Sequence, residues 1–339
     1  MSSRDSMSQE WSRRQWLQST VMAGLGTAAL PAWAQKEGAA AYPSRPIKLM
    51  CPFAPAGGVD ITARAIAQKL TELWGQPVVV ENKAGANGTL AVDQVSKSAA
   101  DGYTLTMISS SHSVNVTLQT QQPYDLVRDL VPITQATTQP YVLVVNPSLP
   151  VRTVPELLAY ARTRPNGLTY GSSGIGGFSH LAGALLSSMT GAPMTHIPYK
   201  GGSLAMNDVI SGQIDMLFST ILQSHGHIGS GRLRPLAVST RQRSRSLPQI
   251  PTMQEAGVKG YEVAGWYGML APAATPAPIV EKLNQAVVGI LRTPAMAERL
   301  AVDGSEPVGS TPAEFGNHVR SEIAKWRALI KEMGIKAEA

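Results

Sequence analysis

The chain has 339 residues, a formal net charge of +6, 43% apolar residues and a single cysteine, Cys51. This length is long for one hydrophobic core and suits two domains. The basic residues are scattered, apart from Arg241, Arg243 and Arg245, which we interpret as a solvated surface loop. No aromatics are interleaved with them, which argues against a nucleic-acid groove, although a mildly basic balance favours small acidic ligands. Cys51 has no partner for a disulfide within the chain, and its apolar surroundings predict a buried thiol.

Residues 1–34 have the pattern of an export signal. Ser12-Arg13-Arg14-Gln15-Trp16-Leu17 is similar to a twin-arginine motif, an apolar stretch follows over 21–30, and Ala32-Trp33-Ala34 provides small residues for cleavage. The apolar stretch is too short to cross a bilayer, which takes about 20 apolar residues. We therefore expect a mature protein that is exported to the periplasm by the twin-arginine route and is soluble there.

Strand, turn and helix patterns alternate in the first part of the mature chain. An apolar run over 47–51 enters the turn Pro52-Phe53-Ala54-Pro55-Ala56-Gly57-Gly58-Val59-Asp60, and a helical period follows over 61–73. A strand over 78–82, a glycine turn over 83–88 and a helix over 89–99 come next. A third strand, over 103–108, ends in Ser109-Ser110-Ser111-His112. This alternation predicts a parallel sheet, with ligands at the carboxyl ends of its strands, where the three turns lie.

The same order restarts after residue 140. Strands are predicted over 141–145, from 168, from 195, over 213–218 and over 233–239, and the helices between them open at 153 or end at 189 and 210. Residues 261–270 are predicted to form a crossing or edge strand. Three helices, over 279–291, 294–302 and 312–333, close the chain without strands of their own. They are expected to pack on an existing domain, most simply the first, so the chain crosses between two α/β units twice.

Each unit directs a glycine-rich helix N-terminus toward a common space. The free N–H groups and the positive end of the helix dipole at such a place bind a carboxylate, phosphate or sulfate. The second glycine turn, Ser172-Ser173-Gly174-Ile175-Gly176-Gly177, adds two hydroxyl groups. For the first turn considered alone, the simpler interpretation is a tight turn with Asp60 as the helix N-cap.

The sequence offers no set of residues for catalysis or for a cofactor. Ser172 and Ser173 lack the flanking glycines of a nucleophile elbow, no glycine turn has the Lys-Ser or Lys-Thr of a P-loop, and the glycine spacing differs from the dinucleotide fingerprint. His225-Gly226-His227 lacks a third metal ligand nearby and is interpreted as a solvated loop. We therefore expect no metal, no cofactor and no turnover.

Eight short stretches, in order, carry a resemblance to a known family. They are Tyr42-Pro43-Ser44-Arg45-Pro46-Ile47, Pro52 to Asp60, Val80-Glu81-Asn82-Lys83-Ala84-Gly85-Ala86-Asn87-Gly88, Asp101-Gly102-Tyr103-Thr104-Leu105, Ser172-Ser173-Gly174-Ile175-Gly176, His196-Ile197-Pro198-Tyr199-Lys200-Gly201, Pro248-Gln249-Ile250-Pro251-Thr252, and Trp266-Tyr267-Gly268 with Ala271-Pro272. With them, the chain resembles the Bug-type periplasmic solute receptors of tripartite tricarboxylate transporters over nearly its whole mature length.

The resemblance implies an α/β fold of two lobes, each a mainly parallel sheet flanked by helices, that close on a carboxylate. Lobe 1 would comprise residues 42–140 and 264–339, and lobe 2 residues 141–263. By position, the ligand-binding residues would come from the turns and strand ends of both lobes. They are Phe53, Pro55, Ala56, Gly57, Gly58, Val59, Asp60, Gly88, Ser109, Ser172, Ser173, Gly174, Ile175, Gly176, Gly177, Tyr199, Lys200 and Ser219.

The resemblance also implies the partners: a small carboxylate ligand and the membrane permease subunits of a tripartite tricarboxylate transporter. We expect a monomer that binds no nucleic acid. Two alternatives stay open. One is a periplasmic enzyme that acts on an anionic substrate with His180 or His196 as base, and the other is a ligand-loaded sensor for a membrane kinase.

Three departures from the family pattern suggest the type of ligand. Val59 and Gly177 stand where relatives commonly have hydroxyl residues, and Ser219 stands where amino-acid-binding relatives can have an acidic residue. Burying an unpaired polar group costs about 1–3 kcal/mol. These residues therefore predict a carboxylate with an apolar or aromatic body and no amino group, unless water replaces the missing side chains.

Overall fold

The computed structural model describes residues 41–119, 121–199, 201–301 and 304–336, which belong to one compact unit, Ala39–Ala339. The predicted export signal, residues 1–34, lies outside the described residues, as does Lys200 of the predicted site. No helix among the described residues is both long enough and apolar enough to cross a membrane.

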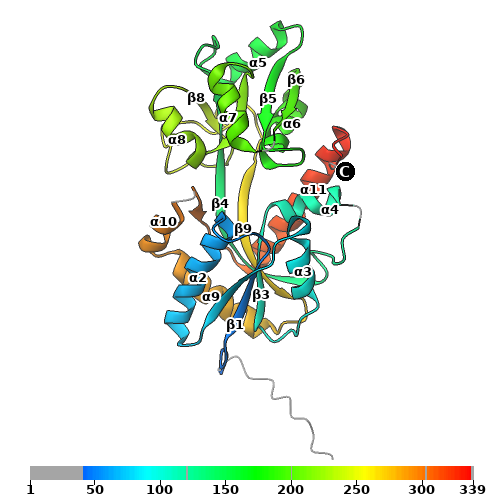
Figure 1. The fold of residues 1–339 in the computed structure, drawn as a ribbon, viewed down its shortest axis with the longest axis vertical. Helices are drawn as coiled ribbons and strands as arrows, with labels where there is room; N and C mark the ends of the chain where they lie inside the picture. The colour runs from blue at the N-terminus through cyan, green and yellow to red at the C-terminus, as the bar shows by residue number, and fades with distance from the viewer. Residues whose placement is uncertain (1–40, 120, 200, 302–303, 337–339) are drawn as a thin grey trace, which may run out of the picture. The chain divides into compact units, whose positions relative to one another are not determined.

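One mixed sheet carries the fold (Figure 1). Its strands are β1 (Ile47–Cys51), β2 (Val78–Asn82), β3 (Thr104–Ser109), β4 (Leu130–Val145), β5 (Leu168–Ser172), β6 (Met194–Pro198), β7 (Met216–Thr220), β8 (Arg234–Val238), β9 (Ala264–Pro272) and β10 (Glu306–Pro307). They lie in the order β2-β1-β3-β9-β4-β7-β5-β6, and β8 and β10 each pair with β4. The pairs β1–β2, β1–β3, β5–β6 and β5–β7 are parallel, as the alternating pattern predicted, whereas β4 and β9 run antiparallel to their neighbours.

The long strand β4 joins two halves of this sheet. Its residues 130–140 pair with β9, and its residues 141–145 pair with β7 and β8. We call β2, β1, β3, β9, β10 and residues 130–140 the first half, and β5, β6, β7 and β8 with residues 141–145 the second half. The prediction that this strand begins at Tyr141 was wrong. Pro132 and several polar residues hide the strand pattern, and two shifts in the pairing with β9 accommodate them.

The strand predicted over 261–270 is β9, which lies between β3 and β4. The crossing interpretation is therefore confirmed, and the edge interpretation is wrong. Because β9 brings the chain back from the second half to the first, the two halves are joined by two chain segments.

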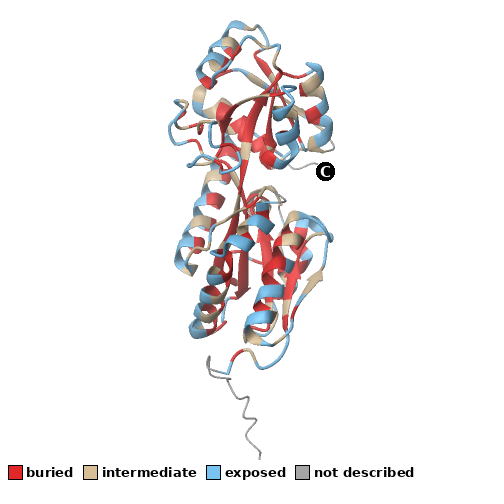
Figure 2. Cartoon of the chain, turned by 90° about the vertical axis from the view of Figure 1, so that its left-hand side faces the viewer, coloured by how far each residue is buried: buried red, intermediate tan, exposed pale blue. Residues whose placement is uncertain are grey.

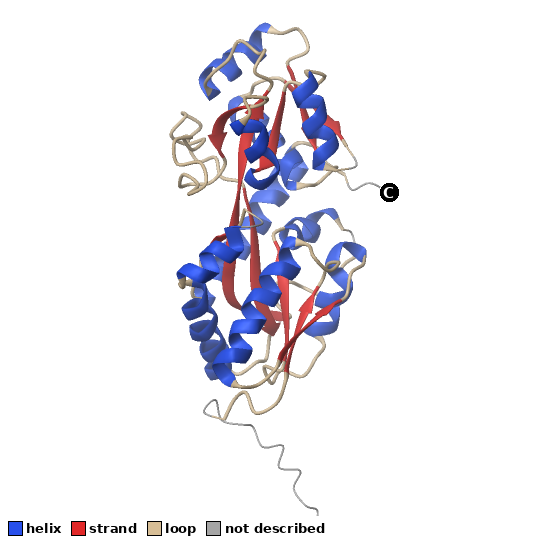
Figure 3. Cartoon of the chain, turned by 60° about the vertical axis from the view of Figure 1, so that its left-hand side comes forward, coloured by secondary structure: helices blue, strands red, loops and turns tan. Residues whose placement is uncertain are grey.

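Alternation along each strand builds a core on both faces of the sheet. In the first half, Leu49 packs into a cluster with residues of helix α2 (Gly58–Trp74), whereas the next residue, Met50, packs into a cluster with helix α11 (Pro312–Glu332). Leu143 and Val144 divide in the same way in the second half. Buried residues accordingly follow the strands in Figure 2, and helices cover them in Figure 3.

The other helices are η1 (Ala86–Gly88), α3 (Thr89–Ser96), α4 (Ser111–Leu118), α5 (Val154–Thr163), α6 (Phe178–Thr190), α7 (Gly202–Ser211), α8 (Ile221–Gly229), α9 (Ala277–Leu291) and α10 (Pro294–Ala301). Two of the α-helices were missed in the sequence, and η1 lies within the predicted glycine turn. Ser111 and His112 begin α4 rather than ending a turn, and His225 and His227 lie in α8 rather than in a loop. Serine and β-branched residues have weak helix propensity, which explains the first error.

Helix α11 packs on both halves rather than only on the first. Phe315 and Val319 belong to a core cluster of the first half, and Trp326 and Leu329 belong to a core cluster of the second. Figure 1 shows this last helix, coloured red, running alongside both parts of the sheet. The start of α11 is fixed by a capping box, in which Thr311 and Glu314 satisfy each other's backbone N–H groups.

Candidate functional site

The first glycine turn leads from β1 into α2. Gly57 is the N-cap, with φ −78° and ψ 164°, and the first intrahelical bond runs from Ile61 N–H to the Gly57 carbonyl at 2.9 Å. The backbone N–H groups of Gly58, Val59 and Asp60 precede that bond and are therefore donors without an intrahelical acceptor. The interpretation of Asp60 as N-cap is wrong, because Asp60 is the third residue of the helix.

The Asp60 carboxylate is occupied by the protein itself. It accepts hydrogen bonds from Ala56 N–H at 3.0 Å, from Arg64 Nε at 2.9 and 3.0 Å, and from Asn82 Nδ2 at 2.8 Å. Burial alone would raise the pKa of Asp60, but these bonds outweigh burial and lower it. Asp60 is only 3% exposed. Asp60 is thus a buried anion that stabilises the turn and offers no free oxygen to a ligand.

Buried His112, at the start of α4, contacts three of the predicted site residues. Its Nδ1 lies 3.0 Å from the Ser109 carbonyl oxygen, and its ring meets Phe53 edge-on at 5.7 Å. A side chain on Gly88 would place Cβ 2.6 Å from His112 Nε2, and Gly88 has a φ of +90°, so only glycine fits there. Burial lowers the pKa of His112 to about 4 and keeps the ring neutral. Sequence reasoning missed His112, whose only signal was its place just after a strand end.

The second glycine turn leads from β5 into α6 and is held by side chains of that helix. Gly177 is the N-cap, with φ −68° and ψ 158°. Ser173 N–H donates to Ser179 Oγ, and Gly176 N–H donates to His180 Nδ1, both at 3.0 Å. Gly176 itself has a φ of +76°. As in the first turn, the first N–H groups of the helix precede its first internal bond, from Leu181 N–H to the Gly177 carbonyl.

Two imidazoles stack beneath this turn. The rings of His180 and His196 lie 3.7 Å apart and 7° from parallel. Burial and then the neighbouring ring lower the pKa of His180 to about 4, and burial lowers the pKa of His196 to about 4. The Ser172 hydroxyl lies 2.7 Å from His196 Nε2 and accepts a hydrogen bond from Gly174 N–H at 3.1 Å. Ser172 is completely buried, so this serine–histidine pair holds the turn and presents no accessible nucleophile.

Helix α4 connects the two turns. His112, near the start of α4, contacts the predicted residues Phe53, Gly88 and Ser109. Leu118, at the end of α4, contacts the second turn, since a Cβ on Gly176 would lie 2.5 Å from Leu118 Cδ1. The rise of an α-helix from His112 to Leu118 is roughly 9 Å. The two sets of predicted residues therefore lie at opposite ends of one short helix.

The remaining predicted residues are placed less directly. Pro55, Ala56 and Gly57 are exposed at the first turn, and Ser173 and Ile175 are exposed at the second. Val59 is buried in the core, so only its backbone can face a ligand. The hydroxyl of Tyr199 donates to Asp208 at 2.6 Å, and buried Ser219 donates to the Thr220 carbonyl at 3.0 Å. Neither hydroxyl is free for a ligand in this arrangement.

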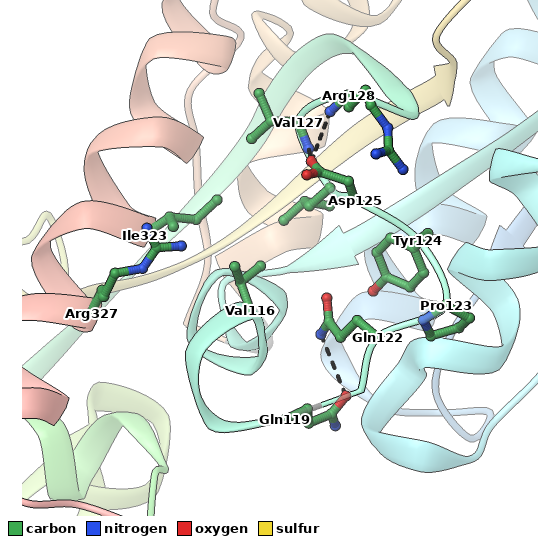
Figure 4. A pocket seen from close by; sticks show the side chains of 11 residues that line it. Val116, Gln119, Gln122, Pro123, Tyr124, Asp125, Val127, Arg128, Ile323 and Arg327 are labelled. Atoms are coloured by element: carbon green, nitrogen blue, oxygen red, sulfur yellow. Dashed lines mark hydrogen bonds between the residues drawn. The ribbon is translucent and has the colours of Figure 1, made fainter.

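Other places in the fold show no competing chemistry. Within the described residues, no three His, Cys, Asp or Glu side chains are grouped so as to hold a metal ion. Cys51 is a buried free thiol whose pKa is raised by burial. A cavity of about 480 Å³ lies between α4, the segment 122–128 and α11 (Figure 4), and none of its lining residues belongs to the predicted site. Arg128 at its rim is paired with Asp129.

Comparison with known proteins identifies the family. Residues 62–335 match the model described as the tripartite tricarboxylate transporter family receptor. The chain is similar to the protein BugT of Bordetella pertussis, with 37% identity over 297 residues that cover 87% of this chain and 91% of BugT.

Two solved structures of Rhodopseudomonas palustris proteins are similar throughout. Rpa4515 with adipate is 38% identical, covers 87% of this chain and 99% of its own, and gives a TM-score of 0.70. MatC with bound malate is 29% identical, covers 85% of this chain and 100% of its own, and gives a TM-score of 0.65. The chain therefore belongs to the tripartite tricarboxylate transporter receptor family, whose members are periplasmic solute-binding proteins of two-lobed α/β fold rather than enzymes.

Proposed function

We propose that the protein captures a small carboxylate between two lobes and delivers it to the permease of a tripartite tricarboxylate transporter. The observation that carries the proposal is the pair of glycine turns, each ending in free helix N–H groups, which α4 links through His112 against Phe53 and Leu118 against Gly176. The relatives with adipate and malate support a carboxylate as the ligand. Export by the twin-arginine route is part of the proposal and rests on Arg13 and Arg14.

We take the lobes to be residues 42–140 with 264–339, and residues 141–263. The change of partners along β4 supports this division, because residue 140 still pairs with β9 whereas Tyr141 pairs with β7. A hinge motion across β4 and the segment before β9 would then close the lobes on the ligand. Helix α11, which contacts both cores, would limit that motion.

The ligand is expected to lack an amino group. An ammonium group in a cleft needs an acidic partner, and the carboxylate nearest the first turn, Asp60, is already bound to Arg64 and Asn82. The earlier reason for an apolar or aromatic body is not supported. Val59 lies in the core, Ser219 is occupied by a backbone carbonyl, and a Cβ on Gly177 would already lie 3.0 Å from Ser173 Oγ. These three positions therefore do not show that polar partners for a ligand are missing from a cleft.

A carboxylate panel tests the proposal. Adipate, malate, citrate, benzoate and glutamate are added to the mature protein in thermal-shift assays and then titrated by calorimetry. A ligand at a hundredfold excess over its dissociation constant stabilises the native state by about 2.7 kcal/mol. We expect at least one carboxylate to bind without being consumed, and glutamate to bind more weakly than a dicarboxylate without an amino group. Steady product formation would contradict the proposal, and so would the absence of binding by every carboxylate of the panel.

The partner is tested separately. The permease subunits encoded with a receptor of this kind are placed in vesicles, and uptake of the bound carboxylate is measured with and without the receptor. Receptor-dependent uptake supports the transport role. Binding to a sensor kinase in place of uptake would favour the alternative role in signalling. The expected monomer is checked by light scattering with and without ligand.

A further inference from the structure

Three aromatic rings form a cluster next to the second glycine turn. His180 comes from α6, His196 from β6 and Tyr170 from β5. The two imidazoles stack at 3.7 Å, and the tyrosine ring lies 5.1 Å from His196 and 6.3 Å from His180. His180 is 6% exposed and His196 is half-buried. Gly176 bonds to His180, and Gly174 is linked to His196 through Ser172. The conformation of residues 174–176 therefore depends on how the polar atoms of these rings are bonded.

The hydrogen bond of His180 fixes its protonation state. Its Nδ1 accepts from Gly176 N–H at 3.0 Å, so Nδ1 carries no proton and the neutral ring carries it on Nε2. A proton on Nδ1 would point at the Gly176 N–H group, and two donors cannot form a hydrogen bond. Gly176 holds the left-handed φ of +76° directly before the N-cap Gly177, and this bond secures it there.

The first turn contains the same bond with a different acceptor. Ala56, directly before the N-cap Gly57, has a φ of +66°, and its N–H donates to the carboxylate of Asp60. Asp60 and His180 are both the third residue of their helices. Two unlike side chains thus perform one structural task, which indicates that the task is needed at both turns.

We propose that His180 is the positioning residue of the second binding turn, and that its neutral imidazole sets the affinity for the carboxylate by holding Gly176 in the left-handed conformation. This inference rests on the proposed function of the turn. The residue acts through the backbone and needs no contact with the ligand. A bound anion at the second turn is not repelled by the acceptor of this bond, because the His180 ring is neutral. At the equivalent place of the first turn, Asp60 has a negative charge.

The surroundings of His180 keep the ring neutral. The titratable groups that face it are His196 from β6 and Tyr170 from β5. Burial opposes the charged form of His180 most strongly, the neighbouring ring of His196 opposes it next, and the positive end of the α6 dipole acts in the same direction. The pKa of His180 is lowered to about 4, so the neutral form is present throughout the neutral range.

Three substitutions at one position test the proposal. Asparagine places Oδ1 close to where histidine has Nδ1, so His180→Asn keeps a neutral acceptor for Gly176. His180→Leu fills the space without an acceptor. His180→Asp keeps the acceptor and adds a negative charge like that of Asp60. His225→Asn, on the exposed part of α8, is the control for loss of a histidine.

The first readout needs no ligand and is the amide signal of Gly176 in NMR spectra. We expect this amide to stay protected from exchange in His180→Asn and His180→Asp and to lose protection in His180→Leu. On acidification its chemical shift should titrate in the wild type and stay constant in His180→Asn. If His180→Leu fails to fold, the Asn variant and the acid titration of the wild type still decide.

The second readout is the dissociation constant for adipate. Loss of one hydrogen bond corresponds to about a tenfold change, so we expect roughly tenfold weaker binding for His180→Leu. His180→Asp keeps the bond but places a negative charge beside the carboxylate, so its binding should also weaken, and His180→Asn should bind nearly like the wild type. Unchanged Gly176 protection and unchanged affinity in His180→Leu would overturn the inference. Failure of the wild type to bind adipate would count against the proposed function, whereas the NMR result would still decide the role of His180.

Discussion

The two glycine turns have nearly the same backbone, but one holds it with a charged acceptor and the other with a neutral one. Ala56 and Gly176 both have positive φ, at +66° and +76°, and the N-caps Gly57 and Gly177 are alike, with φ −78° and ψ 164° against φ −68° and ψ 158°. The acceptor at the third helical residue is an anion in the first turn, Asp60, and a neutral ring in the second, His180. The same backbone geometry is thus held by an aspartate in one turn and by a histidine in the other.

This difference indicates which turn provides the positive potential for a bound carboxylate. Asp60 offsets the positive end of the α2 dipole and is itself offset by Arg64, whose side chain is 48% exposed. At α6 the first turn of the helix contains no acidic residue, and both nearby imidazoles are neutral. In the proposed complex the first turn therefore contributes mainly the geometry of its backbone. The second turn contributes the positive end of the α6 dipole, which no acidic residue offsets.

The largest expected effect is the loss of stability in acid. Buried His112 binds a proton at about pH 4 when folded, whereas an unfolded histidine does so near 6.5. Its contribution is therefore complete above pH 6.5 and is lost as the pH falls toward 4, by roughly 3 kcal/mol for a shift of this size. Asp60, whose pKa is lowered, keeps its contribution over this range and loses it only in stronger acid.

Urea unfolding at about pH 7 and about pH 4.5 measures this loss. His112→Asn should start less stable and show a shallower dependence on pH, and exposed His225→Asn should behave like the wild type. A wild-type free energy of unfolding that is flat across the range would show that His112 takes up its proton normally in the folded protein.

The next effect separates charge from shape at the first turn. Asp60→Asn keeps the size of the side chain and removes the charge from the bonds to Ala56 and Arg64. We expect a loss of about 1–3 kcal/mol in stability. Carboxylate affinity should rise several-fold at low salt and less at high salt, because Arg64 and the α2 dipole are no longer offset.

Asp101→Asn serves as the matched control, since Asp101 pairs with Arg45 at the surface. Exposed pairs contribute about 0–1 kcal/mol, so this variant should change stability little and affinity not at all. Weaker carboxylate binding by Asp60→Asn would show that the rigidity of the turn matters more than its charge.

A third effect comes from the glycines. Gly176→Ala forces a side chain onto a φ of +76° beside Leu118 and should cost about 1 kcal/mol in stability. Gly57 has a φ of −78°, and a Cβ there would lie 3.6 Å from the Ala54 carbonyl oxygen, an ordinary contact. Gly57→Ala should therefore keep full stability.

The affinity of Gly57→Ala decides what the first turn does. Weaker binding at unchanged melting temperature means that the ligand approaches the Gly57 backbone, which the sequence-based hypothesis required. Unchanged binding restricts Gly57 to a role in the turn. An equal loss of stability in both alanine variants would contradict the difference in φ between the two glycines.

These comparisons also show what the sequence could predict. The βα units that form both turns follow from apolar runs, helical periods and glycines, and they were placed nearly correctly. The resemblance to the receptor family gave the two-lobed fold, which the relatives confirm. Both kinds of signal are local or depend on order along the chain.

What the sequence hid depends on distant contacts. Asp60 and Asn82 are 22 residues apart, and Ser172 and His196 are 24 apart, so neither network has a local pattern. Helix α4 contains serines and β-branched residues and reads as an extended segment. The equivalence of Asp60 and His180 could not be predicted, because only the backbone shows that they accept the same bond.

The smallest effect concerns the one exposed hydroxyl that distinguishes the turns. No serine or threonine lies between Phe53 and Asp60, whereas Ser173 is exposed in the second turn, with its hydroxyl 3.2 Å from Ser179 Oγ. Ser173→Ala keeps the backbone bond from residue 173 to Ser179, so stability should change by less than about 0.5 kcal/mol. Ser179→Ala removes that acceptor and should cost about 1 kcal/mol. If the Ser173 hydroxyl donates to the carboxylate, calorimetry on Ser173→Ala will show several-fold weaker binding at an unchanged melting temperature. Identical binding would mean that the backbone N–H groups of α6 suffice and that the chemical difference between the turns is confined to Asp60 and His180.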